Sequence, residues 1–408
     1  MRIMKHLVRP SLLAVALASP TLPGALQQTA WAQTDQPAAA APAVPRVATP
    51  WSRDRAETLL AYIGGLPAEG LTPSVYGPER LRAALGDEAA RTRVADEIFL
   101  KLAGDLSGGH VRGADRVSWY MAPSGAGEAE RQRLLGVAKS GDVVEVLNGL
   151  LPTHAQYIGL RRALAQTEAG DTRRRDLIRT NMERWRWLPR NLGERHVIVN
   201  VPAFTAALVE DGQVVARHRA VVGAVSTPTP QLSATITAVT FNPWWTVPQS
   251  IIRGMRSFGG YQVTQRGNYR IVRQPPGPAN SLGRVKIEMP NEHAIYLHDT
   301  PSQSLFNRPV RAFSHGCIRT HAVRDFAELL LQPTGQWNRA QIDETIATGR
   351  TVQARMAAPI PVYISYFTAA ATNDGNIVTY TDVYGRDTRV RQALNRATPA
   401  TESLASGS

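Results

Sequence analysis

The chain has 408 residues, of which 43% are hydrophobic and 19% are charged. These values exclude a disordered or fibrous protein and leave room for about two or three folded domains. The net charge of +13 favours anionic polymers or surfaces as neighbours. Only four of the 46 basic residues are lysines, however, and an arginine bias can reflect genome composition alone. We therefore base no function class on charge.

Residues 1–32 are predicted to be an export signal. Three basic residues, Arg2, Lys5 and Arg9, precede the apolar run at 11–18, and small residues at 30–32 stand at cleavage spacing before a cut near Ala32. The run is too short to span a membrane, although an interfacial anchor is the alternative. The mature chain is therefore expected outside the cytoplasm, with no stable membrane span.

The next segments are predicted to be a tether and a helical domain. Residues 33–50 are rich in Ala and Pro, which is typical of a semi-extended tether. Apolar residues recur at helical spacing over 51–169, a segment without cysteine, paired acids or a glycine-rich phosphate loop, so we interpret it as a scaffold. The Arg-rich residues 170–190 are predicted to form a connecting helix anchored by Trp185 and Trp187.

From residue 191 the periodicity changes to that of strands, so residues 191–389 are predicted to be a mostly β domain with two short helices. The fold class is therefore α+β, and residues 390–408 are predicted to be a frayed tail. The expected strands are 196–201, 204–210, 213–222, 234–241, 284–289, 294–298, 351–354, 361–368 and 376–384, and the expected helices are 322–331 and 338–347.

Cys317 is the only cysteine, so no intramolecular disulfide can form. A free cysteine is either a small buried hydrophobe or a nucleophile. With an ordinary pKa of about 8.5, only roughly 3% of a thiol is ionised at pH 7, so attack on an amide needs a base. Two candidate bases, His298 and His315, lie close in sequence.

The residues beside Cys317 add two further elements of acyl-transfer chemistry. Gly316 allows a tight turn that would direct backbone N–H groups toward a developing oxyanion. Arg319 can grip a carboxylate through two hydrogen bonds. Together these residues predict acyl transfer through a thioester on Cys317.

The same residues resemble the signature of the YkuD-type L,D-transpeptidases. His298 is followed, after fifteen residues, by Ser314-His315-Gly316-Cys317 and then Arg319. The likeness extends over roughly residues 51–388. The segments at 242–251, 275–286 and 361–369 are similar to the larger periplasmic YcbB-like members, and those at 70–73, 105–109 and 152–157 to their scaffold domain.

The resemblance implies a periplasmic enzyme that cross-links peptidoglycan. Cys317 would attack the carbonyl of an L-centre in a donor stem peptide, and the diaminopimelate side-chain amine of an acceptor stem would take the acyl group. It implies His298 as the base and the N–H groups of Gly316 and Cys317 as the oxyanion hole. The remaining implied roles are a pocket or oxyanion role for His315 and substrate contacts from Tyr296, Ser314, Asp299 and Arg319.

The amide bond supplies the driving force, so no ATP is needed. No cofactor, metal or nucleic-acid partner is expected. The resemblance also implies that carbapenems acylate Cys317. Two departures from the larger relatives matter. There is no room for an inserted peptidoglycan-binding module, and the capping segment near 251–275 is short, which leaves both a 3-3 and a 1-3 cross-link open.

Three alternatives remain at this point. Water in place of the amine would give an L,D-carboxypeptidase. A non-enzymatic wall-binding protein would keep Cys317 buried. A metal site is the third, and its candidate ligands are His293, His298, His315, Cys317 and His321.

Overall fold

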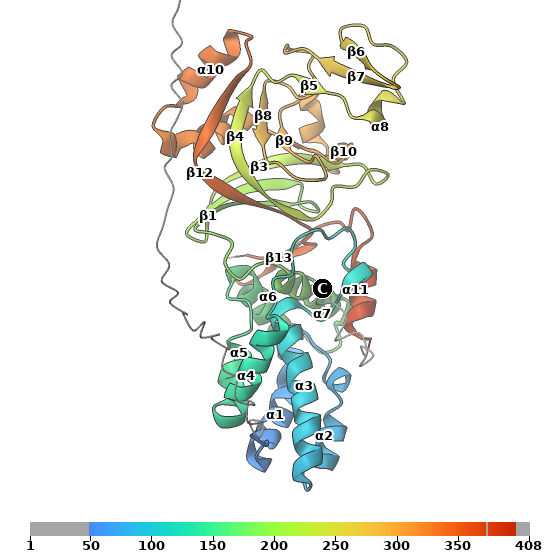
Figure 1. Cartoon of the computed structure of the whole chain (residues 1–408), viewed down its shortest axis with the longest axis vertical. Helices are drawn as coiled ribbons and strands as arrows, with labels where there is room; N and C mark the ends of the chain where they lie inside the picture. Colours follow the sequence, from blue (N-terminus) through green and yellow to red (C-terminus); the bar gives the residue numbers. More distant parts are fainter. Residues whose placement is uncertain (1–48, 373, 397–408) are drawn as a thin grey trace, which may run out of the picture. The chain divides into compact units, whose positions relative to one another are not determined.

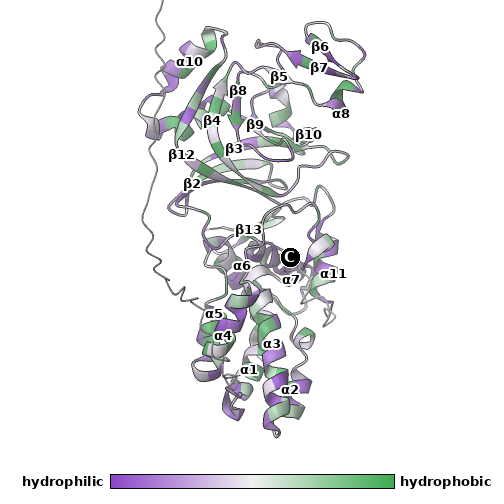
Figure 2. Cartoon of the chain, viewed as in Figure 1, coloured by the Kyte–Doolittle hydropathy of each residue, from purple (hydrophilic) through white to green (hydrophobic). Residues whose placement is uncertain are grey.

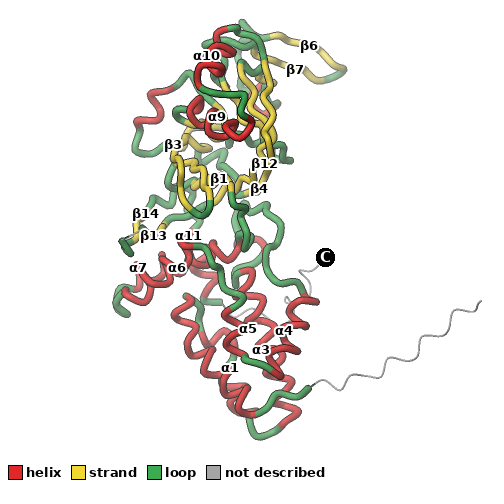
Figure 3. Tube along the Cα trace, turned by 90° about the vertical axis from the view of Figure 1, so that its left-hand side faces the viewer, coloured by secondary structure: helices red, strands yellow, loops and turns green. Residues whose placement is uncertain are grey.

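The computed structural model describes residues 49–372 and 374–396. The predicted export signal and almost all of the predicted tether lie outside these residues, as does the predicted tail from 397 onward. Within the described part, helices come first and strands second along the chain, which confirms the α+β class (Figures 1 and 3). None of the described helices combines the length and apolarity that a membrane crossing requires.

The helical part packs around the long helix α3 (Glu88–Gly108). The Asp87 carboxylate caps this helix by accepting the Ala90 N–H at 2.7 Å, and Val94, Ile98 and Leu102 recur at helical spacing on its buried face. The other helices of this part are α1 (Arg53–Gly65), α2 (Pro78–Ala84), α4 (Glu128–Ser140), α5 (Val143–Asn148) and α6 (Ala155–Gln166), with short 3-10 turns η1 (Leu66–Glu69), η2 (Pro73–Tyr76) and η3 (Gly113–Asp115).

Helix α7 (Thr172–Trp187) is hydrophilic in composition, yet its second half is buried (Figure 2). The Glu183 carboxylate accepts hydrogen bonds from the Val111 N–H at 2.7 Å and the Trp187 indole at 3.0 Å, and it pairs with Arg186 at 3.1 Å. Arg186 also donates to the Tyr157 hydroxyl at 2.8 Å. The predicted connecting helix is therefore held by a buried polar network as well as by its indoles.

The β part is a nine-stranded mixed sheet in the order β10-β3-β11-β9-β8-β4-β12-β1-β2. Because β2 also pairs with β3, the sheet closes on itself and protects its edges. The core inside it is aliphatic, and α9 packs against it through Phe326 and Leu330 (Figure 3). The strands are β1 (Arg195–Asn200), β2 (Thr205–Glu210), β3 (Gln213–Gly223), β4 (Leu232–Phe241), β8 (Val285–Glu288), β9 (Leu297–His298), β10 (Ala312–Ser314), β11 (Ile318–Thr320) and β12 (Val352–Ser365), and the helices are α9 (Val323–Leu331) and α10 (Arg339–Ala347), with turns η4 (Gln303–Asn307) and η5 (Gln332–Thr334).

The C-terminal segment returns from the sheet to the helices. Here β13 (Ala369–Ala371) and β14 (Ile377–Thr379) form a hairpin, and Gln156 of α6 exchanges two hydrogen bonds with the Ala371 backbone, at 2.9 and 2.8 Å. In α11 (Asp387–Leu394), Asp387 pairs with the buried Arg184 at 2.6 Å. The segment that follows the sheet thus packs back on the helical part through β13 and through α11.

Three expectations for local structure were wrong. The predicted tail at 390–408 begins inside α11, because Val390, Ala393 and Leu394 form a buried helical stripe. The predicted strands 351–354 and 361–368 belong to one strand, β12, with an irregular pairing between Arg355 and Ile360.

The capping segment near 251–275 contains an unpredicted hairpin of β6 (Gln262–Arg266) and β7 (Tyr269–Gln274), and β5 (Trp245–Thr246) pairs with β7. The short helix α8 (Gln249–Ile252) precedes the hairpin. Every residue of β6 is exposed, so the hydrophobic alternation that marks a half-buried strand is missing there.

We predict that Glu183→Ala destabilises the protein strongly, because it leaves Arg186 buried without its carboxylate. The loss should be about 3–5 kcal/mol in the free energy of unfolding, measured by urea denaturation followed by circular dichroism. Glu57→Ala, which breaks the exposed pair with Arg53, is the control and should cost less than about 1 kcal/mol. Equal effects of the two variants would contradict the role assigned to the buried network.

Candidate active site

The alternation of side chains along β9 and β11 brings four predicted site residues to one face of the sheet. Leu297 and Ile318 are paired across the two strands and point into the aliphatic core. Their neighbours in sequence therefore point to the opposite face, because side chains alternate along a strand. These neighbours are Tyr296, His298, Cys317 and Arg319.

The register places His298 diagonally from Cys317. His298 is the direct partner of Arg319, and the Ile318 N–H donates to the Tyr296 carbonyl at 3.0 Å. Cys317, two residues before Arg319, and His298 are thus diagonal neighbours on one face of the parallel pair.

Two side-chain hydroxyl groups form hydrogen bonds to the backbone of the turn that carries Cys317. Gly316 has φ of +112°, a conformation that suits glycine. The Ser314 hydroxyl donates to the Cys317 carbonyl at 2.6 Å and accepts the Gly316 N–H at 3.1 Å. The buried Thr229 hydroxyl donates to the Gly316 carbonyl at 2.8 Å and accepts the Gly223 N–H at 2.8 Å. The turn is therefore fixed before any substrate binds.

These contacts change the predicted oxyanion hole. The Gly316 N–H is already bonded to Ser314, so the expected contribution of Gly316 is wrong. The Cys317 N–H belongs to the same peptide unit as the Gly316 carbonyl, which Thr229 holds, and in a trans peptide these two groups point in opposite directions. The Cys317 N–H is thus directed away from Thr229 and remains the backbone donor at the nucleophile.

The sulfur of Cys317 lies in a half-buried site. Its Sγ contacts the Ala294 carbonyl at 3.6 Å, and both the backbone N–H and the hydroxyl of Tyr296 face the sulfur. Burial raises the pKa of the thiol above its usual value, whereas Tyr296, Lys286 and Arg319 oppose this rise. Ala294 has φ of +52°, which places its carbonyl beside the thiol.

His298 is buried and is oriented by a backbone carbonyl. Its Nδ1 lies at the Asp299 carbonyl, which assigns the proton to Nδ1 and leaves Nε2 with a lone pair. Burial, together with the nearby Arg319, lowers the pKa of His298 to about 3. The imidazole is therefore neutral near pH 7 and able to accept a proton.

Two residues that the sequence interpretation missed also contact this face. Lys286 of β8 pairs in register with His298, and its Nζ lies 4.6 Å from the centre of the Tyr296 ring. The Trp245 indole faces the Tyr296 hydroxyl and links the capping segment to the residue beside the sulfur. Neither belongs to the motif around Cys317: Trp245 lies in the segment 242–251 and Lys286 at the end of the segment 275–286, and strand pairing brings both to this face.

Three predicted residues have other surroundings than expected. Ser314 is 2% exposed and its hydroxyl is used within the turn, so the predicted substrate contact is wrong. The Asp299 carboxylate accepts the Arg284 N–H at 2.8 Å and the Gln303 amide at 3.2 Å, so it supports the loop after His298. His315 is exposed in the turn, and its imidazole has no hydrogen bond to any residue within 49–372 or 374–396.

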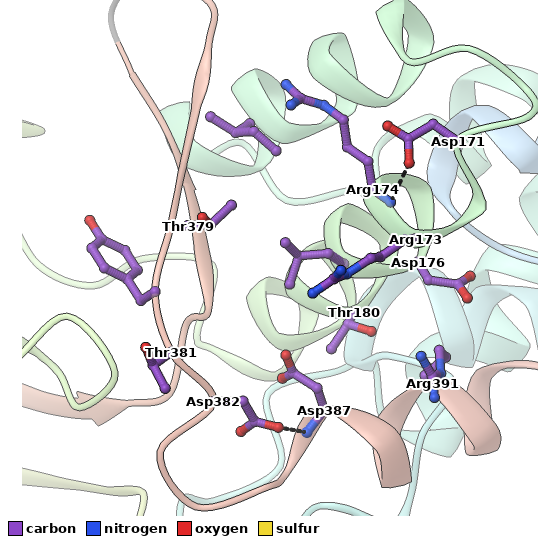
Figure 4. A pocket seen from close by; sticks show the side chains of 13 residues that line it. Asp171, Arg173, Arg174, Asp176, Thr180, Thr379, Thr381, Asp382, Asp387 and Arg391 are labelled. Carbon is purple, nitrogen blue, oxygen red and sulfur yellow. Dashed lines mark hydrogen bonds between the residues drawn. The ribbon is translucent and has the colours of Figure 1, made fainter. Parts of the chain in front are cut away.

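Among the described residues, the predicted site contains no cluster of metal ligands, and it lies away from a cavity near the helical part. Across the described residues, no group of three or more His, Cys, Asp and Glu side chains is placed to hold a metal ion. A cavity of about 560 Å³ lies elsewhere, between α7, β14 and α11 (Figure 4). Its carboxylates are bonded within the chain, as Asp171 is to the Arg174 N–H and Asp382 to the Asp387 N–H.

Comparison with known families agrees with this site. Residues 194–364 match the YkuD model, described as the L,D-transpeptidase catalytic domain, and residues 48–164 match the Scaffold domain model. The chain therefore carries a segment that matches the L,D-transpeptidase catalytic domain of the YkuD family, preceded by a segment that matches the Scaffold domain.

Individual relatives cover the chain only in part. A Haemophilus influenzae protein, provisionally named an L,D-transpeptidase, is 32% identical over 227 residues, which are 48% of this chain and 45% of that protein. The chain thus spans less than half of that relative's length.

The similar solved structures include L,D-transpeptidases from Mycobacterium smegmatis and Enterococcus faecium. The first is 16% identical with a TM-score of 0.24, covering 42% of this chain and 58% of that one. The second, a C442S mutant, is 14% identical with a TM-score of 0.21, covering 44% and 52%.

We predict that Thr229→Val slows acylation of Cys317 by a carbapenem between about tenfold and 100-fold, because the turn loses the hydroxyl behind the Gly316 carbonyl. The rate is measured by mass spectrometry of the intact protein. Thr227→Val is the matched control, since Thr227 donates to a Ser314 carbonyl that also accepts the Ala224 N–H. Its rate should change less than about threefold. A larger loss in the control would overturn the assignment.

We also predict that the acylation rate shows no acidic limb between about pH 5 and 7. A histidine of ordinary pKa would become protonated in this range and lose its base function, whereas His298 stays neutral down to its lowered pKa of about 3. Alkylation of Cys317 by iodoacetamide should instead rise with pH through values above the ordinary thiol pKa. An acidic limb near pH 6.5 in acylation would contradict the buried, neutral imidazole.

Proposed function

We propose that the protein is a peptidoglycan L,D-transpeptidase that uses Cys317 as its nucleophile. The observation that carries the proposal is the single face on which a half-buried thiol, a neutral imidazole with a free Nε2 and two cationic side chains converge. This set of groups is suited to acyl transfer from an amide donor.

In the proposed first half-reaction, the Cys317 sulfur attacks the carbonyl carbon of an L-centre in the donor stem, and His298 Nε2 takes the thiol proton. The oxyanion is stabilised by the Cys317 N–H, with the Tyr296 hydroxyl as the second donor. The C–N bond then breaks, the leaving D-residue takes the proton from His298, and a thioester remains on Cys317.

In the second half-reaction, the side-chain amine of an acceptor diaminopimelate attacks the thioester. His298 takes a proton from the amine and returns it to the sulfur as the C–S bond breaks, which restores the free enzyme. Arg319 is half-exposed on the same face as the sulfur and is suited to hold a carboxylate of the stem. No cofactor enters the balance of either step.

The surroundings in which this chemistry would operate are also proposals. We place the mature protein in the periplasm, on the strength of the predicted signal at 1–32, where its substrate lies. The capping segment, with its β6–β7 hairpin, borders the site through Trp245 and Tyr296. Because the capping segment is small, the donor stem can be attacked in either of two registers, at its residue 3 or at its residue 1.

The deciding experiment adds the purified mature protein to sacculi and analyses the muropeptides by tandem mass spectrometry. We expect new dimers, and their fragmentation identifies a 3-3 or a 1-3 linkage. Cys317→Ser should form none. Trimmed monomers without dimers would assign the chain to the L,D-carboxypeptidases, and no change in the muropeptides would overturn the proposal.

A further inference from the structure

A segment of the helical part reaches the rim of the catalytic site. Residues 117–120, which follow η3, are bonded to Gln231 at the start of β4: the Tyr120 N–H donates to the Gln231 carbonyl at 2.8 Å, and the Gln231 N–H donates to the Ser118 carbonyl at 2.8 Å. The Gln231 side-chain amide adds a bond to the Val117 carbonyl at 2.9 Å. Gln231 is 2% exposed, so this junction is fixed.

The junction uses the backbone of Tyr120 and not its side chain. The inward packing comes from Trp119, whose ring lies 5.2 Å from that of Trp187. Ser118 adopts φ of +53°, an unfavourable conformation for a residue with a Cβ. The Tyr120 side chain is 55% exposed, so its burial gives little stability in return.

The Tyr120 ring lies against His293, with 4.1 Å between ring centroids and 48° between the planes. His293 belongs to the loop 291–295, whose Ala294 carbonyl contacts Cys317 Sγ. Asn291 fixes this loop by itself: its side chain donates to the carbonyls of Met289 and Ile295 and accepts the N–H groups of His293 and Ile295. Tyr120 is therefore not needed to shape the loop.

The exposed groups at this place fit a sugar ring. Tyr120 and His293 present apolar ring faces with polar edges, and the adjacent exposed Glu292 supplies hydrogen-bond acceptors. The carboxylate would repel a carboxylate of a stem peptide, whereas it accepts hydrogen bonds from neutral sugar hydroxyls. Stem carboxylates have a separate cation, Arg319, on the sheet face.

We propose that Tyr120, His293 and Glu292 form a subsite for a sugar ring of the glycan strand to which a stem peptide is attached. The inference rests on the proposed function and deepens it, since the helical part would contribute directly to substrate binding. The enzyme would then prefer stems that still carry their sugars over free stem peptides.

The test compares turnover of a disaccharide-tetrapeptide with that of the free tetrapeptide, using the full mature chain. Tyr120→Ala should raise KM for the sugar-bearing substrate about tenfold, a size consistent with loss of one aromatic contact, with kcat nearly unchanged. KM for the free tetrapeptide and the rate of carbapenem acylation of Cys317 should stay within twofold. Tyr120→Phe should retain the sugar preference.

Ile158→Ala, which removes another exposed apolar side chain of the helical part, is the matched control and should leave both KM values unchanged. Equal changes for the two substrates in Tyr120→Ala, or no change for either, would overturn the sugar subsite while leaving the transpeptidase proposal intact. Failure of acylation in the unmodified chain would instead count against Cys317 as the nucleophile.

Discussion

The catalytic arrangement depends on one constraint, which is that the carbonyl groups of the turn carrying Cys317 are bonded away from the substrate face. The Ser314 carbonyl accepts the Ala224 N–H, the Gly316 carbonyl accepts the Thr229 hydroxyl, and the Cys317 carbonyl accepts the Ser314 hydroxyl. A carbonyl that turned toward the sulfur would oppose both the thiolate and the oxyanion. The positive φ of Gly316 allows the chain to satisfy all these bonds at once.

The charges on the face of the sheet act on two groups in compatible directions. Burial raises the pKa of the Cys317 thiol, and Lys286 and Arg319 oppose this rise, whereas burial lowers the pKa of His298 and the same two cations lower it further. The same positive field therefore favours the ionised sulfur and disfavours the imidazolium, so the histidine remains a base. Lys286 is itself balanced by Glu288 at 2.7 Å, which limits the field at the strand next to His298.

The sequence was most informative where one residue type carries its own chemistry. The lone Cys317, the neighbouring His298 and the glycine of the turn could be found in the motif, and the α+β class followed from the change of periodicity near residue 190. The sequence could not show three contacts of the site, because the residues that make them are distant in sequence from the motif. Thr229 reaches the turn from the loop between β3 and β4, Lys286 through strand pairing and Trp245 through the capping segment. Trp245 and Lys286 lie in the segments 242–251 and 275–286 that resemble the family, but the resemblance alone does not place them beside Tyr296 and His298.

Local assignments failed where a contact replaced the expected role. The N–H of Gly316 and the hydroxyl of Ser314 were assigned to the substrate, but they satisfy each other in the turn. Similarly, the predicted tail began inside α11. The apolar stripe of this helix is short, and it stabilises the helix only by packing against α7 and the rest of the helical core. Both errors arise because hydrogen-bond partners and packing faces are properties of the folded chain.

The turn between α6 and α7 is a position at which an additional module can be inserted into such a chain. Gly170 lies there in open space, and the turn closes through short backbone bonds, such as the Asp171 N–H to the Glu168 carbonyl at 3.1 Å. By contrast, the C-terminal segment that leaves the sheet after β12 packs back on the helices, with β13 on α6 and α11 on α7. Extra modules can therefore be gained or lost at this turn, as an insertion with both ends side by side, while a cut that separates the helices from the sheet would leave two incomplete cores.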